Sequence, residues 1–205
     1  MATIIERTNN TFNKLRHKYL DGFVFIHINK TGGSSVQKAL DIPFEHDTAL
    51  EKIACMGLKR WEKKYSFAVV RNPWDKVVSH YHYRVLTNQT GLGANTIGFN
   101  QWVKRTYGEQ DPTFYNNPKM FMPNIGWIAD EQNNILVNKV IRFENLDTEF
   151  DEVCGELRLS VELPHVKKSK HNHYSRYYDQ DTIQIVSEWF KSDIDAFGYQ
   201  FESIG

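Results

Sequence analysis

A lysine and a glycine-rich turn join an apolar run to the start of a helical pattern near the N-terminus of the chain. The residues of this turn are, in order, Lys30, Thr31, Gly32, Gly33, Ser34 and Ser35. A turn of this kind points backbone N–H groups at one spot, where two serine hydroxyls and an ammonium join them. Proteins hold phosphate with such groups, so the turn predicts a site for an anionic ligand that carries phosphate.

A second cation follows the next apolar run, residues 66–70. Arg71 comes directly after this run, and Ser79 lies about two turns further along a predicted helix. Asn72 suits the N-cap of that helix, and Asp75 suits its first turn. Because a planar guanidinium matches phosphate oxygens and a serine hydroxyl adds a donor, Arg71 and Ser79 indicate a second site, for a terminal phosphate monoester.

Alternating strands and helices must position these groups. Apolar runs predict strands at residues 23–28, 66–70 and 136–143. Helical patterns begin at residue 34 and also cover residues 48–63, 72–85, 99–107, 146–157 and 183–197. Strands that alternate with helices form parallel sheets, whose ligands bind at the carboxyl ends of the strands. We therefore expect an α/β fold with a central parallel sheet flanked by helices, and both anion sites at the same edge of that sheet.

The order of residues in the turn argues against an ordinary nucleoside triphosphatase. In such enzymes the lysine follows the last glycine and a Ser or Thr holds magnesium, whereas Lys30 precedes both glycines. The second strand leads into Arg71 instead of the carboxylate that a magnesium site needs. We predict no metal. A nucleotide kinase of the P-loop class and a non-catalytic nucleotide-binding protein stay as alternatives.

Residues 30–36 and 71–81 resemble, in this order and spacing, the two donor-binding motifs of sulfotransferases that use 3′-phosphoadenosine 5′-phosphosulfate (PAPS). The similarity is to the carbohydrate branch, with its bacterial members and the heparan-sulfate 2-O enzymes. Residues 141–146 and 193–199 are similar to the tail of bacterial members, so the resemblance covers residues 22–201. It implies a P-loop-like three-layer fold, PAPS as the sulfuryl donor and 3′-phosphoadenosine 5′-phosphate (PAP) as the product.

The resemblance also implies roles for single residues. Lys30 would stabilise the charge that grows on the bridging oxygen of the departing phosphate. The 5′-phosphosulfate would bind the turn, through Lys30, Thr31, Gly32, Gly33, Ser34 and Ser35. The 3′-phosphate would bind Arg71 and Ser79. Family members have a basic loop that closes over this phosphate, and the basic stretch 164–178 offers Lys168 and Lys170 for the same contact.

An acceptor hydroxyl needs a base, and we predict His46. It lies between the two anion motifs, where similar sugar sulfotransferases have a catalytic histidine, and an imidazole suits proton transfer near neutral pH. Glu45 and Asp47 are expected to orient its ring, and Glu45 is the alternative base. Asp47 is also a candidate N-cap for the helix that follows.

Composition limits the remaining function classes. Lys plus Arg and Asp plus Glu both number 25, so the formal net charge is zero, and we expect no nucleic acid partner. A length of 205 residues with 40% hydrophobic content suits one domain, residues 1–205, with an N-terminal extension at 1–20. We find no signal peptide or spanning segment and expect a cytoplasmic location. Cys55 and Cys154 are predicted to lie on buried helix faces.

We therefore expect an enzyme that moves the sulfuryl group of PAPS in line to an acceptor hydroxyl, on a carbohydrate, with His46 as the base. A peptide tyrosine, a lipid or a small phenol stays open as the acceptor. Seven aromatic residues are candidates for stacking on sugar rings, although at 14% aromatic content many of them must belong to the core, namely Tyr81, Tyr83, Trp102, Tyr107, Phe114, Tyr115 and Trp127. The sequence does not specify the regiochemistry or the oligomeric state.

Overall fold

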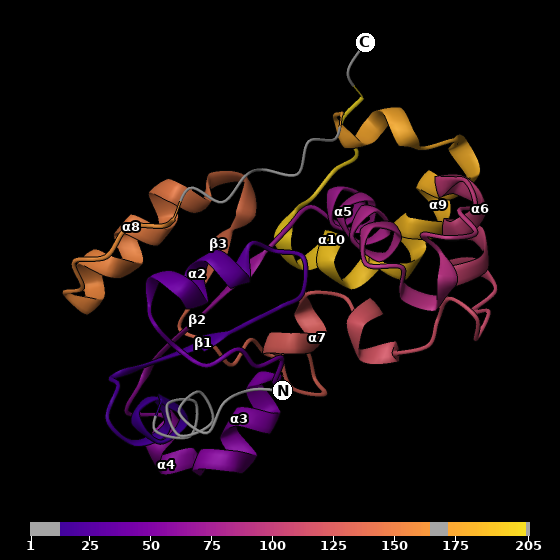
Figure 1. Ribbon diagram of the computed structural model, residues 1–205. Helices are drawn as coiled ribbons and strands as arrows, with labels where there is room; N and C mark the ends of the chain where they lie inside the picture. Colours follow the sequence, from indigo (N-terminus) through magenta and orange to yellow (C-terminus); the bar gives the residue numbers. More distant parts are fainter. Residues whose placement is uncertain (1–12, 165–171, 204–205) are drawn as a thin grey trace. The chain divides into compact units, whose positions relative to one another are not determined.

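The computed structural model describes residues 13–164 and 172–203 (Figure 1). The chain divides into two compact units. Unit 1 comprises residues 1–70 and 126–166, and unit 2 comprises residues 71–125 and 167–205. The predicted turn at residues 30–35 belongs to unit 1, whereas Arg71 and Ser79 belong to unit 2.

The described part of unit 1 is built on a parallel sheet of three strands in the order β1-β2-β3. These strands are β1 Phe23–Ile26, β2 Tyr65–Val70 and β3 Lys139–Arg142. Phe25 pairs with Phe67, and Phe67 pairs with Lys139 on the other side. Successive residues of β1 and β2 are buried, as expected for strands covered on both faces. The predicted α/β fold with a central parallel sheet is confirmed, although β3 is shorter than the predicted strand at 136–143.

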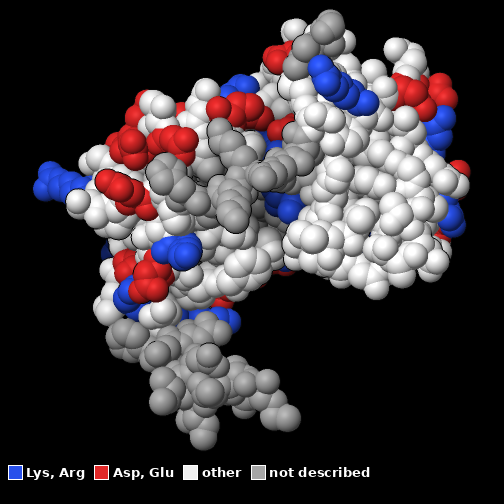
Figure 2. Space-filling model, turned by 45° about the horizontal axis from the view of Figure 1, so that its top comes forward, with Lys and Arg blue, Asp and Glu red and all other residues white. Residues whose placement is uncertain are grey.

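Two helices cover one face of this sheet. They are α2 Gly33–Ala39 and α8 Leu146–Leu157. Their apolar residues recur every three or four positions and pack with alternate strand residues into one core, formed by Phe23, Phe25, Val36, Leu40, Ile42, Phe67, Val69, Ile141, Phe150, Val153 and Cys154. The other side of α8 carries acidic side chains, which gather over this helix in Figure 2. The amphipathic pattern of α8 thus explains both its core contacts and its charged surface.

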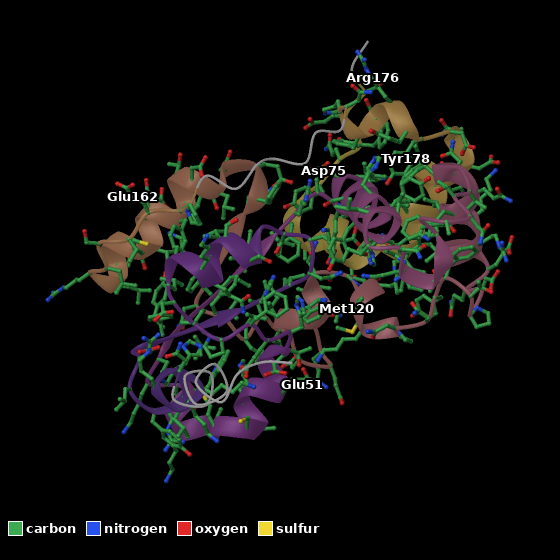
Figure 3. The ribbon with its side chains drawn as sticks, viewed as in Figure 1. Glu51, Asp75, Met120, Glu162, Arg176 and Tyr178 are labelled. Atoms are coloured by element: carbon green, nitrogen blue, oxygen red, sulfur yellow. The ribbon has the colours of Figure 1, made fainter. Side chains whose placement is uncertain are left out.

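The helical pattern predicted at residues 48–63 forms two helices, α3 Ala49–Met56 and α4 Leu58–Trp61. They are separated by Gly57, whose φ of 86° is not helical. The N-cap of α3 is Thr48, and the predicted Asp47 cap is wrong. Thr48 and Glu51, which is labelled in Figure 3, form a capping box in which each side chain accepts from the other's backbone N–H.

The longest helix of unit 2 is α5 Pro73–Leu86. It begins as predicted, because Asn72 Oδ1 accepts from the backbone N–H of Trp74 at 3.0 Å and of Asp75 at 3.3 Å. Pro73 stands in the first turn, where its missing N–H has no helical partner to lose. The start of α5 therefore fixes the backbone that immediately follows Arg71.

The other elements of unit 2 are short. They are η1 Gln89–Gly91, α6 Phe99–Val103, the π-helical η2 Lys104–Gly108, η3 Pro118–Phe121, η5 Tyr174–Tyr177, α9 Gln180–Trp189 and α10 Lys191–Phe197. The single helical pattern predicted at 183–197 breaks at Phe190, whose ψ of 22° ends α9. Phe190 and Trp102 are almost fully buried, so aromatic rings form much of this core.

Two further short elements belong to unit 1 or to its border with unit 2. The helix α7 Ile125–Ile128 starts at the last residue of the first segment of unit 2, and η4 Phe143–Asn145 links β3 to α8. Cys154 is buried as predicted, whereas Cys55 is exposed, so its prediction as a core residue is wrong. None of the helices in the described ranges combines the length and the apolar character that a bilayer crossing requires.

Candidate donor and acceptor site

The predicted anion-binding turn in unit 1 has a constrained backbone. Lys30 and Gly32 both adopt the left-handed conformation, with φ values of 65° and 81°. A Cβ atom at Gly32 would lie 2.9 Å from Leu146 Cδ2, so a larger residue would meet both steric and backbone strain. Thr31 is fully buried, and its Oγ1 donates to Ile28 O at 2.9 Å. The Thr31 hydroxyl therefore stabilises the turn. A ligand would contact Thr31 through the backbone N–H of this residue.

The side chains of this turn differ in exposure. Ser34 is exposed, while Lys30 and Ser35 are half-buried. Nearby protein excludes part of the water around a half-buried lysine. Its ammonium therefore attracts an anionic ligand more strongly than the ammonium of a fully exposed lysine would. The turn thus presents a cation and serine hydroxyls from one short segment, as the sequence predicts.

A buried histidine that the sequence analysis missed supports this turn. His27 follows β1 and is only 3% exposed. A Cβ atom at Gly33 would lie 2.0 Å from His27 Cδ2, so only glycine lets the turn approach the imidazole ring. Burial, together with the nearby His46, lowers the pKa of His27 to about 3, and its ring is neutral at physiological pH. The only sequence signal for this role is a histidine within an apolar run.

Replacing Gly33 with alanine should therefore destabilise the protein. The added methyl group must displace the His27 ring, and overpacking of this kind costs about 1–3 kcal/mol. Urea unfolding followed by circular dichroism measures this difference. Gly155→Ala is the matched control, because nothing lies within 4 Å of its Cβ position and alanine favours the helix α8. A Gly33→Ala protein as stable as the wild type would contradict the close contact with His27.

His46, the predicted base, lies directly beside His27. The centroids of the two rings are 4.3 Å apart, and His46 Nδ1 is 3.0 Å from the backbone oxygen of His27. Because a carbonyl oxygen only accepts, Nδ1 carries the proton, and Nε2 of the neutral ring has an available lone pair. The geometry thus gives His46 the tautomer that a general base needs, and His27 contacts both His46 and the predicted anion-binding turn.

Neither Glu45 nor Asp47 orients the ring of His46, so that prediction is wrong. Both carboxylates bind Lys52, and the second oxygen of Glu45 is 3.1 Å from Lys14 Nζ. Burial raises the pKa of Glu45, but Lys52 and Lys14 outweigh burial and leave that pKa below its ordinary value. A carboxylate held in the charged form by two ammonium groups is a weak base, which favours His46 over Glu45.

The second predicted anion site lies in unit 2. Arg71 and Ser79 are both buried, and the Nε and Nη2 atoms of Arg71 each lie 2.8 Å from Asp75 Oδ2. Asp75, labelled in Figure 3, is in the first turn of α5, and Ser79 is one turn further along. Residues four apart share a helix face, so Asp75 holds the guanidinium over the face that carries Ser79. The carboxylate predicted to favour the helix start thus also positions Arg71.

A buried network fixes the backbone of Arg71. The side-chain amide of Asn124 donates to Arg71 O at 3.0 Å and to Asp193 Oδ2 at 2.9 Å. Asn124 Oδ1 accepts from Lys76 Nζ at 3.0 Å, and the backbone N–H of Ile125 donates to Asp193 Oδ1 at 2.8 Å. Burial raises the pKa of Asp193 and lowers that of Lys76 to about 8. The network joins residues that are far apart in sequence. The one sequence signal for it was the similarity of residues 193–199 to bacterial family members.

The structure also bears on the remaining predicted site residues. Lys168 and Lys170 lie outside the described residues. Most of the aromatic candidates for stacking on sugar rings are buried core residues instead, namely Tyr81, Trp102, Tyr107, Phe114 and Trp127, in agreement with the expectation that many of the candidates belong to the core. Tyr83 is exposed and Tyr115 is half-buried. In the described ranges no three His, Cys, Asp or Glu residues are grouped closely enough to hold a metal ion.

The family comparison agrees with the predicted sulfuryl transfer. The model of the sulfotransferase family matches residues 15–200, which is most of the chain. The chain therefore belongs to the sulfotransferase family and is an enzyme that transfers sulfuryl groups. The alternatives of a nucleotide kinase and of a non-catalytic binding protein have no support from this match.

No curated protein sequence matches the chain. Among solved structures, the crystal structure of a sulfotransferase from Alicyclobacillus acidocaldarius is similar, with 14% sequence identity and a TM-score of 0.40. The similarity covers 92% of this chain and 84% of the other chain.

Proposed function

We propose that this enzyme moves the sulfuryl group of PAPS to a hydroxyl group of a carbohydrate, with His46 as the general base. The observation that carries the proposal is the hydrogen bond between His46 Nδ1 and the His27 carbonyl, 3.0 Å long. It leaves Nε2 to take the acceptor proton, next to a histidine that also contacts the anion-binding turn. The base and a cation thus belong to one connected part of unit 1.

The proposed reaction assigns each group a step. The acceptor oxygen attacks sulfur while the bond from sulfur to the bridging oxygen of the donor breaks, and the acceptor proton passes to His46 Nε2. Negative charge grows on the bridging oxygen, where the ammonium of Lys30 stabilises it. Backbone N–H groups of residues 31–34 and the hydroxyls of Ser34 and Ser35 bind the 5′-phosphosulfate. PAP leaves, and the reaction needs no metal because the transferred group carries less charge than a phosphoryl group.

In this proposal Arg71 and Ser79 bind the 3′-phosphate. A change at Arg71 should therefore affect a nucleotide that carries this phosphate more than one that lacks it. Arg71→Ala should weaken PAP binding by roughly ten- to a hundredfold, the loss expected for a charged hydrogen bond. Binding of adenosine 5′-phosphosulfate, which lacks the 3′-phosphate, should change little. Calorimetric titration of both ligands measures the two dissociation constants.

A matched control for this variant is Arg105→Ala. Arg105 belongs to the same unit and also pairs with an aspartate, Asp111, but it is not in either predicted motif. It should leave both affinities near their wild-type values. Equal losses for the two nucleotides in Arg71→Ala would remove Arg71 from the 3′-phosphate site.

The donor assignment is tested by titrating the purified protein with PAP in the absence of metal, and with ATP plus magnesium for comparison. Tight binding of PAP is expected, with weak binding of ATP. A preference for ATP with magnesium would contradict PAPS as the donor. The cytoplasmic location and the organisation as one domain over residues 1–205 stay predictions.

A further inference from the structure

Phe44 is exposed on an anchored segment of unit 1. It is 64% exposed, although Ile42 and Pro43 before it are buried. The side-chain amide of Gln37 donates to Pro43 O at 2.7 Å, which ties this segment to α2. The backbone therefore holds the phenyl ring where most of its apolar surface stays in contact with water.

The exposed ring is also oriented. Its centroid lies 4.9 Å from that of His46, with an angle of 83° between the planes, and 5.1 Å from that of His27, with an angle of 89°. Edge-to-face arrangements of this kind are attractive. Phe44 thus adjoins the proposed base and keeps a fixed orientation relative to it.

Phe44 differs in exposure from the other aromatic side chains that contact His46. Among the described residues, the rings that contact His46 are those of His27, Phe44 and Trp127. His27 and Trp127 are buried, so Phe44 is the exposed one of the three. A ligand that brings a hydroxyl group to His46 can reach an aromatic surface only through Phe44 within this set.

We infer that Phe44 is a stacking platform for the pyranose ring of the acceptor, an inference that rests on the proposed function. The C–H face of a pyranose is apolar and packs on an aromatic ring, while its hydroxyls need polar partners. Glu45 and Asp47 flank the platform in sequence, and their side chains keep 24% and 42% exposure beside Lys52. Carboxylates accept hydrogen bonds from hydroxyls. An exposed ring with carboxylates beside it suits a sugar, whose hydroxyls surround an apolar ring, better than a phenol, which has a single hydroxyl.

The test compares three acceptors with the wild type and the Phe44→Ala variant. Methyl β-D-glucopyranoside offers a pyranose ring, glycerol offers hydroxyls without a ring, and p-cresol offers a phenol. Transfer of labelled sulfuryl from PAPS gives KM and kcat, and saturation-transfer NMR in the presence of PAP reports binding directly. Phe44→Ala should raise KM for the glucoside about tenfold or more, because one apolar ring contact is lost. The rate with glycerol and the affinity for PAP should stay near the wild-type values.

Two variants separate stacking from a structural effect. Phe44→Trp should keep the preference for the glucoside over glycerol, since it keeps an aromatic face. Leu50→Ala changes another exposed apolar side chain of unit 1, and it should leave KM and kcat unchanged for all three acceptors. Equal losses for the glucoside and glycerol in Phe44→Ala would overturn the platform, and so would a wild type that prefers p-cresol.

The remaining outcomes are also decisive. If PAP binds tightly but the wild type neither binds nor sulfates the glucoside in preference to glycerol, the platform is wrong and the donor assignment stands. If PAP itself fails to bind, the proposed function is wrong and the platform fails with it. The nucleotide titration therefore distinguishes failure of this inference from failure of the proposed function.

Discussion

Replacing Lys30 with alanine is expected to lower kcat by about a hundred- to a thousandfold, the effect of removing one group that stabilises transition-state charge. The charge on the bridging oxygen is larger in the transition state than in bound PAPS, so the ammonium contributes most when the bond to sulfur breaks. The affinity for PAPS should fall much less, by roughly tenfold or less. Single-turnover rates and calorimetric titration with PAPS measure the two effects separately.

Lys38→Ala is the matched control for Lys30→Ala, because Lys38 is an exposed lysine on α2, close in sequence to the turn. It should leave both kcat and PAPS affinity nearly unchanged. If Lys30→Ala lost affinity and turnover by the same factor, Lys30 would bind the donor uniformly instead of acting in the transition state.

His46→Ala is expected to lower the rate about a hundredfold or more, the usual contribution of a positioned general base, while PAP binding stays intact. In the proposed mechanism the His46 ring takes the acceptor proton as the oxygen attacks sulfur, and the variant lacks this ring. Added imidazole should restore part of the rate, since it can enter the space that the ring leaves. Steady-state rates with and without imidazole, beside a PAP titration, test this assignment.

Glu45→Gln tests the alternative base with almost no change in size. Because Lys52 and Lys14 hold Glu45 in its charged form with a lowered pKa, its neutral substitute should cost less than about tenfold in rate. A loss in Glu45→Gln that equals the loss in His46→Ala, together with no rescue by imidazole, would transfer the role of base to Glu45.

Local signals in the sequence predicted most of the elements. The run Tyr65–Val70 and the helix Pro73–Leu86 follow from apolar residues and from the cap at Asn72. These features depend on residues within a few positions of one another, so sequence patterns predict them well. The break at Phe190 was not predicted, because the apolar residues on both sides keep the same helical spacing across it.

The candidate site was predicted less completely than the fold. The turn at residues 30–35 and His46 could be identified by residue type and order. The contact of His27 with Gly33 could not, because a histidine in an apolar run looks like an ordinary strand residue. Exposure was also beyond the sequence: Trp102 and Phe44 are both aromatic, and only the packing shows that the first is buried and the second is exposed.

The backbone at Lys30 has a consequence for engineering. A residue other than glycine at a φ of 65° pays a steric penalty, which glycine at the same position would relieve. After the greater freedom of glycine in the unfolded chain is counted, the backbone terms alone favour Lys30→Gly by up to about 1 kcal/mol. A screen that selects only for thermostability would therefore favour a substitution that removes the proposed catalytic cation. Efforts to make this enzyme more robust should keep Lys30 fixed and select for sulfuryl transfer at the same time.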